Sequence, residues 1–157
     1  MARTPFDEFL ALSAALTGYS RFRLLGTGQA QLYFSTVTDV VGEATVTALA
    51  QAFARARDGA GTDDPALEQA LRSEILSDEK LGPVARNVIK LWFVGTWYQL
   101  PPEWREAYGT HEKDVTFVAS PAAYTEGLLW PTIDANPSGA KGPGYGTWAL
   151  PPRIDLT

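Results

Sequence analysis

The sequence contains no cysteine, a single histidine and no long apolar run. Without cysteine the chain forms neither a disulfide framework nor a thiolate metal site. Because His111 is the only imidazole, no pair of histidines within the chain is available to bind a metal. The apolar runs are far shorter than the ~20 residues of a membrane-spanning helix, so we expect no span. A formal net charge of −5 and the lack of a basic run argue against nucleic acid as a partner.

The common catalytic motifs are also missing or incomplete. Gly26-Thr27-Gly28 lacks the third glycine of a dinucleotide-binding loop, and no strand precedes it. There is no G-x-S-x-G sequence. Two matches to S-x-x-K, at 77–80 and 138–141, lack the S-D-N and K-T-G elements that would accompany them in a serine acylase. We therefore expect no independent catalysis and no cofactor in this chain.

One small constellation keeps a catalytic alternative open. His111, Glu112 and Asp114 lie together in a charged stretch, which we expect to be a solvated loop. Catalysis would need these groups to converge with further partners around a substrate. A stand-alone enzyme that uses these three residues is therefore the alternative from a different functional class.

The first two thirds of the 157-residue chain are rich in helix signals. Thr4-Pro5 begins the first helix with a capping residue followed by proline, and Thr17-Gly18 ends it. Apolar residues then recur at helical spacing through most of the region. The pattern predicts an all-α domain of roughly five helices. These are expected at about 5–17, 29–41, 43–57 and 65–76, followed by a central helix that ends at Pro101. Residues 19–28 are expected to form a connection and residues 58–64 an exposed loop.

The central helix is the most apolar part of the sequence. From Val88 to Leu100 the only charged residue is Lys90, so neighbours must cover this helix on several sides. Pro101-Pro102 is predicted to end it, because neither residue donates to the helical ladder.

The last third of the chain has a different character. The sequence predicts one helical turn at 103–108, a strand-like segment at 115–118 with no evident partner, and a short helix from Ser120 to about Trp130. From Pro131 to the end there are five prolines and four glycines, so we expect irregular structure. We divide the chain into a helical domain, 1–130, and an extended arm, 131–157, that packs on a partner subunit.

The arm carries more aromatic residues than a disordered linker would. Tyrosine and tryptophan are enriched as anchors of protein interfaces. We predict Trp130, Tyr145, Trp148 and Pro151 as contacts with a partner. The alternative is that the arm folds back over its own helices, and the two arrangements are compatible if the aromatic residues are divided between them.

Three stretches together resemble a known family. Residues 9–18 (FLALSAALTG), 91–95 (LWFVG) and 143–152 (PGYGTWALPP) are similar to the small subunit of bacterial flavin-dependent sugar and polyol dehydrogenases. This family is named after the membrane-bound FAD-containing sorbitol dehydrogenase and includes the small subunits of fructose and glucose dehydrogenases. The three stretches occur in the order found in that family.

The resemblance implies an accessory role. In that family the large subunit, a glucose–methanol–choline type oxidoreductase, holds FAD and oxidises the sugar, often beside an iron–sulfur cluster. A multihaem cytochrome subunit commonly accepts the electrons. The small subunit is needed for the large one to mature, and its twin-arginine leader usually carries the complex across the inner membrane.

This sequence departs from the family pattern in two ways. Met1 to Pro5 leads straight into a helix without a leader, which predicts a cytoplasmic location, or a periplasmic one if a leader has been removed. Residues 136–142 also lack the cysteine that some relatives have, so no disulfide to a partner is available. We expect a non-catalytic subunit of a flavoprotein complex, with a transient assembly chaperone as a further alternative.

Overall fold

Helix α6 (Leu81–Val94) forms the centre of an all-α fold, as the sequence predicts. The computed structural model describes residues 3–137, so the predicted contacts Tyr145, Trp148 and Pro151 lie outside the described residues. Within 3–137, the elements other than α6 are α1 (Pro5–Thr17), α2 (Arg21–Gly26), α3 (Ala30–Val41), α4 (Glu43–Ala60), α5 (Asp64–Ala70), the π-helical segment η1 (Leu71–Leu76), β1 (Thr96–Trp97), α7 (Pro102–Tyr108), β2 (Phe117–Val118), α8 (Pro121–Thr125) and α9 (Leu129–Thr132).

The ends of α1 follow the predicted capping chemistry. The Thr4 hydroxyl accepts a hydrogen bond from the amide of Asp7 at 3.1 Å, and the Asp7 carboxylate accepts one from the amide of Thr4 at 3.2 Å. Hydrogen bonds from the Thr4 hydroxyl and backbone lower the pKa of the Asp7 carboxyl. At the other end Gly18 adopts φ +77°, a left-handed conformation that closes the helix.

The core is built around the buried face of α6. Val84, Val88 and Leu91 have no exposed surface, and α6 packs against α1, α3 and α4. The ring of Trp92 meets that of Tyr33 on α3 edge-to-face, with 4.9 Å between the ring centres. The predicted role of this segment as the central helix is confirmed.

The central helix ends earlier than predicted, at Gly95 rather than at Pro101. Gly95 has φ +68°, and its amide donates to the carbonyl of Leu91 at 2.9 Å. A Cβ atom at Gly95 would lie 2.7 Å from the backbone of Ala123. Glycine is therefore needed both for the left-handed conformation and for the close approach of α8.

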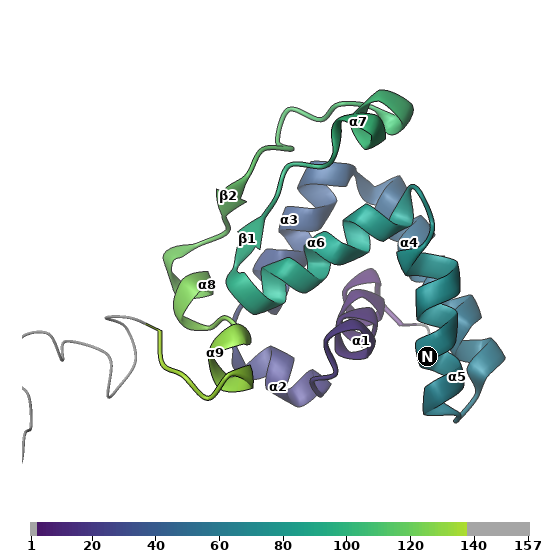
Figure 1. The fold of residues 1–157 in the computed structure, drawn as a ribbon, viewed down its shortest axis with the longest axis horizontal. Coiled ribbons are helices and arrows are strands. Elements are labelled where there is room, and N and C mark those ends of the chain that lie inside the picture. Colours follow the sequence, from purple (N-terminus) through teal and green to yellow (C-terminus); the bar gives the residue numbers. More distant parts are fainter. Residues whose placement is uncertain (1–2, 138–157) are drawn as a thin grey trace, which may run out of the picture.

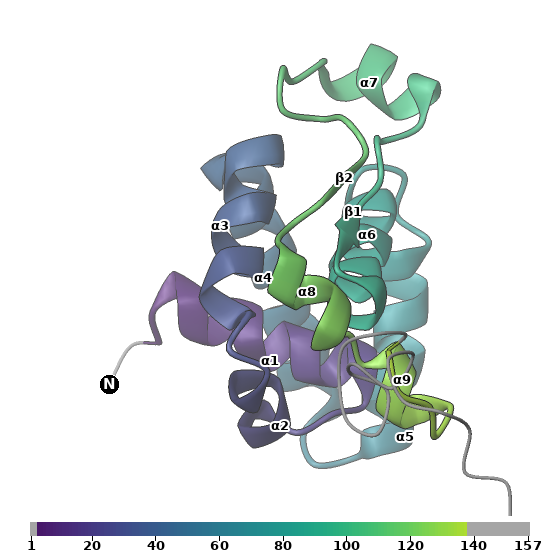
Figure 2. The ribbon, with the colours of Figure 1, turned by 90° about the vertical axis from the view of Figure 1, so that its left-hand side faces the viewer.

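The segment after Gly95 provides the partner that the predicted strand lacked. Residues of β1 and β2 pair antiparallel, with Thr96 opposite Val118 and Trp97 opposite Phe117. Figure 2 shows this chain running from α7 at one end of the molecule, through β2 and α8, to α9 at the other end.

Three further boundaries differ from the sequence prediction. Residues 21–26 of the predicted connection form α2, because the Ser20 hydroxyl caps the amide of Arg23 at 3.2 Å. The predicted loop 58–64 is largely helical, since α4 continues to Ala60 and Asp63 caps α5. The predicted helix 120–130 is split into α8 and α9 around Gly127, where a Cβ atom would lie 2.6 Å from the carbonyl oxygen of Phe93.

Among residues 3–137 no helix combines the length and the apolar character needed to cross a membrane.

Candidate functional site

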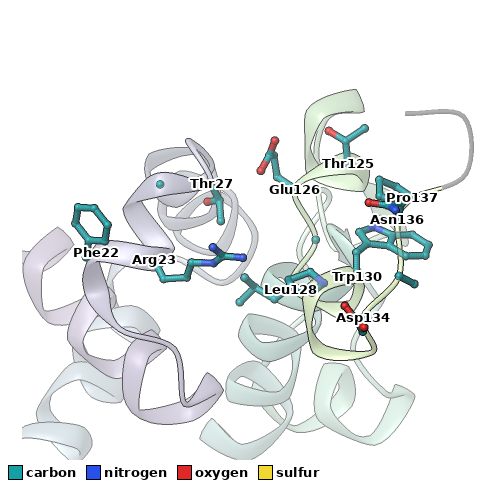
Figure 3. A pocket seen from close by; sticks show the side chains of 14 residues that line it. Phe22, Arg23, Thr27, Thr125, Glu126, Leu128, Trp130, Asp134, Asn136 and Pro137 are labelled. Atoms are coloured by element: carbon teal, nitrogen blue, oxygen red, sulfur yellow. The ribbon is translucent and has the colours of Figure 1, made fainter. Parts of the chain in front are cut away.

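A cleft lies between α2 on one side and the α8–α9 segment on the other, as Figure 3 shows. Its volume is about 510 Å³. Arg23 extends into it from α2, and Trp130, Asn136 and Pro137 lie together on the opposite wall. The lining residues are Phe22, Arg23, Gly26, Thr27, Thr125, Glu126, Gly127, Leu128, Trp130, Pro131, Asp134, Ala135, Asn136 and Pro137.

Two long-range hydrogen bonds fix α2 relative to α8–α9. Just before α2, the hydroxyl of Tyr19 lies 2.6 Å from that of Thr132 on α9. Just after α2, the Ser120 hydroxyl, which caps α8, donates to the side-chain oxygen of Gln29 at 3.1 Å. The two walls are therefore tied together on either side of the cleft.

The end of α6 holds the α8–α9 wall in place. The amide of Leu128 donates to the carbonyl of Trp92 at 2.9 Å, and the Leu128 side chain is buried. Gly127 and Gly95 allow the two backbones to approach closely. Residues 91–95, one of the three stretches noted in the sequence, thus position this wall.

A tight turn after α9 leads the chain along the cleft. The amide of Ala135 donates to the carbonyl of Trp130 at 2.9 Å, and that of Asp134 donates to the carbonyl of Pro131 at 3.3 Å. This is the Schellman pattern, in which the second-last of the six residues adopts the left-handed conformation. Here that conformation belongs to Asp134, the only non-glycine residue with positive φ (54°) among residues 3–137. The turn carries the chain to Pro137, which is buried and lines the cleft.

Three exposed apolar side chains belong to α2 and to the turn after α9, the segments that form the cleft walls. Phe22 on α2 is 88% exposed, Leu25 on the same helix is 50% exposed, and Ile133 beyond α9 is 57% exposed. We call these three residues the apolar rim. Removing the exposed Phe22 ring from water would be favourable by about 25 cal/mol for each Å² of apolar surface that is buried. The rim is therefore apolar surface that residues 3–137 leave exposed.

Trp130, the one predicted contact within the described residues, lies on the cleft wall. Its indole Nε1 donates to the carbonyl of Tyr124 at 2.7 Å, and the two rings meet edge-to-face at 5.5 Å between centres. The side chain is half-buried, so part of the indole faces outward. Its role as an interface contact stays a prediction, and Tyr145, Trp148 and Pro151 lie beyond the described part of the chain.

The structure separates Asp114 from its charged neighbours. Asp114 was expected in a solvated loop, but its side chain is only 2% exposed. Its Oδ1 accepts hydrogen bonds from the indole of Trp97 at 2.9 Å and from the amide of Leu100 at 3.0 Å. Glu112 is exposed, and the half-buried His111 ring lies 6.4 Å from that of Trp104. No group of three or more potential metal ligands gathers within residues 3–137.

Sequence reasoning missed the apolar rim because it treated residues 19–28 as a connection. Ser20 followed by two apolar residues, Leu24 and Leu25, was the available signal of a short capped helix. In α2 the Leu24 side chain is buried and that of Leu25 faces solvent.

Comparison with known proteins gives no family model, curated protein or solved structure that matches this chain.

Proposed function

We propose that this chain is the non-catalytic small subunit of a heteromeric FAD-dependent dehydrogenase of the glucose–methanol–choline type, which oxidises a sugar, glycoside or polyol. The flavoprotein large subunit would hold FAD, with an iron–sulfur cluster where one is present. A cytochrome subunit would accept the electrons. The class of partner comes from the resemblance of residues 9–18, 91–95 and 143–152 to small subunits of that family.

The observation that carries an accessory role is the apolar rim. Phe22 projects from a short helix at the edge of a cleft, where it gains almost nothing from its own domain. Aromatic side chains of this kind act as anchors when a partner supplies the pocket that they fill. The rim and the cleft are therefore the surface on which we place the large subunit.

The positions of the stretches that resemble the small-subunit family support the same binding surface for the large subunit. Residues 9–18 cover most of α1 and its Gly18 cap, and residues 91–95 end α6, against which α1 packs. The rings of Tyr19 and Phe93 meet where these two stretches end, at 6.3 Å between centres. The third stretch lies outside the described residues; the last described residue before it, Pro137, lines the cleft wall that residues 91–95 hold.

The physical role of such a subunit follows from linkage. A protein that binds the native flavoprotein but not its unfolded chain stabilises the native state by RT ln(1 + [L]/Kd), which is about 2.7 kcal/mol at a hundredfold excess over Kd. Maturation and escort of the large subunit then require no catalytic group in this chain. They require a rigid body with exposed apolar anchors.

The test is co-expression with a flavoprotein encoded beside this gene. We expect a stable one-to-one complex on gel filtration, bound FAD in the large subunit, and sugar oxidation by the complex but not by this chain alone. A truncation should end after Pro137, because residues 131–137 belong to the folded body. We expect that truncation to abolish co-purification through the loss of Tyr145, Trp148 and Pro151.

Three results would overturn parts of this proposal. Unchanged complex formation and activity after the truncation would remove the arm from the interface. Release of a mature flavoprotein from the complex would favour the assembly chaperone. Turnover by the isolated chain that is lost in His111→Ala would favour the stand-alone enzyme.

A further inference from the structure

We infer that the guanidinium of Arg23, in the cleft between α2 and α8–α9, binds one carboxylate of the large subunit, from an aspartate or glutamate on a loop that enters the cleft. The inference rests on the proposed function, because it names the chemical group that the large subunit brings to the surface already assigned to it. That surface then combines apolar contacts at the rim with an ion pair inside the cleft.

The first observation is that Arg23 has no partner, whereas most arginines of the described chain have one. Its side chain is exposed, and Figure 3 shows the guanidinium pointing from α2 into the cleft. Arg86 donates to the carbonyl of Leu76 at 2.6 Å. The arginines that lie within ion-pair distance of a carboxylate are Arg3, Arg21, Arg57, Arg72 and Arg105.

Arg23 and Arg55 are thus the two arginines within residues 3–137 whose guanidinium groups form neither a hydrogen bond nor an ion pair. Arg55 is exposed on α4 and does not line the cleft. Arg23 alone directs five unused N–H donors into a concave surface.

The cleft itself does not neutralise Arg23. The carboxylates in its lining belong to Glu126 and Asp134, and within the described chain neither forms an ion pair with Arg23. These two groups also restrict the occupant, because a run of acidic residues would meet like charge on the opposite wall. A single carboxylate on an otherwise neutral loop is the occupant that this lining favours.

Covering the cleft changes what Arg23 requires. Water hydrates its guanidinium in the isolated chain, and a large subunit that buries Phe22 at the rim displaces that water. A cation left buried without a partner would weaken association about a hundredfold or more. A carboxylate avoids this loss, because its two oxygens accept parallel hydrogen bonds from one guanidinium. A backbone carbonyl offers a single uncharged acceptor and compensates less.

The helix that carries Arg23 is fixed before binding. The Tyr19 hydroxyl, just before α2, lies 2.6 Å from that of Thr132, and the adjacent Leu24 side chain is fully buried. Such preorganisation lowers the entropy that the interface must lose. Phe22 and Arg23 also place an aromatic residue and an arginine at consecutive positions of α2, and both types are common among residues that dominate binding energy.

The experiment measures binding of the full-length chain to the flavoprotein encoded beside this gene, purified with FAD bound. Arg23→Gln removes the charge, and Arg23→Glu reverses it. The matched controls are Arg55→Gln and Arg55→Glu, because Arg55 is also exposed and unpaired within residues 3–137 but lies outside the cleft. Helical circular dichroism of each variant establishes that the fold is kept. A second set of flavoproteins carries single replacements of surface aspartate and glutamate residues by lysine.

We expect Arg23→Gln to raise Kd by at least about 30-fold, and the two Arg55 variants to change it by less than about threefold. Arg23→Glu should bind more weakly still. One lysine replacement in the flavoprotein should restore binding of Arg23→Glu and weaken binding of the parent chain. This exchange of charges identifies the carboxylate that enters the cleft.

The outcomes separate the inference from the proposed function. Equal affinities of Arg23→Gln and Arg55→Gln, with binding still weakened by Phe22→Asp, would overturn the ion pair and leave the large subunit on this surface. Failure of every lysine replacement to restore binding of Arg23→Glu would assign the contact to an uncharged acceptor and likewise overturn the inference. Absence of any complex with the parent chain would overturn the proposed function, and the ion pair with it.

Discussion

The indole of Trp97 donates its hydrogen bond to the carboxylate of Asp114, 2.9 Å away and almost fully buried. The same carboxylate accepts the amide of Leu100, and the guanidinium of Arg105 lies 4.0 Å from it. Asp114 therefore connects the chain after β1 to the loop before β2. This structural role explains why an acidic residue stands at this position.

Removal of the Asp114 carboxylate should destabilise the protein. Asp114→Ala would leave the Trp97 indole and the Leu100 amide buried without an acceptor, at about 1–3 kcal/mol for each unpaired group. We expect a loss of about 2–4 kcal/mol in the free energy of unfolding, measured by urea denaturation. The control is Glu112→Ala in the same loop, which is exposed and should change the free energy by less than about 0.5 kcal/mol. Equal effects of the two substitutions would contradict the buried position of Asp114.

Gly95 should tolerate substitution much less well than Gly18. Both have left-handed dihedral angles, with φ of +68° and +77°. Gly18 has open space around its Cβ position, whereas a Cβ atom at Gly95 would lie 2.7 Å from the Ala123 backbone. Gly18→Ala should cost about 1–2 kcal/mol, from the left-handed conformation alone. Gly95→Ala should cost more, because α8 must also move; thermal unfolding of the two variants side by side measures the difference, and a smaller loss at Gly95 would refute the close contact.

The hydroxyl of Tyr33 should make stability sensitive to alkaline pH. It is buried without a hydrogen-bond partner among residues 3–137, and burial, followed by the charge of Glu126, raises the pKa of this phenol above its ordinary 10.0. The folded state therefore holds the proton more tightly than the unfolded state. Its contribution to stability is fully present below pH 10 and is lost as the pH rises beyond that value.

Tyr33→Phe isolates this contribution. At pH 7 the variant should be as stable as the parent or more stable, by up to about 1 kcal/mol, because an unpaired buried hydroxyl is removed. Between pH 10 and 11.5 the parent should lose more stability than the variant. Urea denaturation of both proteins at pH 7, 10 and 11.5 gives the free energies of unfolding. Equal losses of stability in the two proteins between pH 10 and 11.5 would show that Tyr33 does not titrate in this way.

The left-handed conformation of Asp134 predicts a stabilising substitution. Glycine is the usual residue at this place in a Schellman turn. Asp134→Gly should raise the free energy of unfolding by about 0.5–1 kcal/mol, whereas Asp134→Val should lower it, since branched residues fit this conformation poorly. Melting temperatures of the two variants test the assignment. A lower melting temperature for the glycine variant would indicate a contact of the Asp134 side chain that outweighs the strain.

The sequence predicted the parts of the fold that depend on local chemistry. The cap at Thr4, the stop at Gly18 and the apolar face of α6 are each set by residues a few positions apart. The Asp78 carboxylate is a local signal of the same kind, because it accepts the amides of Lys80 and Leu81 at the start of α6. Such signals are read from short windows.

The parts of the fold and of the cleft that the sequence did not predict depend on contacts between residues far apart in the chain. The pairing of β1 with β2 joins strands of only two residues across some twenty positions, which no local pattern reveals. The requirement for glycine at 95 and 127 arises from the approach of α8 and α9 to the end of α6. The cleft depends on contacts of Tyr19 with Thr132 and of Gln29 with Ser120, separated by 113 and 91 positions. The aromatic composition of the arm was evident from the sequence, but the cleft beside the start of the arm was not.

The most direct test of the accessory-subunit account is the affinity of the flavoprotein for a variant with a charge on the apolar rim. Phe22→Asp should weaken binding of the large subunit by about 2 kcal/mol or more, or ~30-fold in Kd, as expected for an aromatic anchor. Val115→Asp is the matched control, because Val115 is 50% exposed and does not line the cleft. Equal affinity of the Phe22→Asp and Val115→Asp variants, with both proteins folded, would contradict the account.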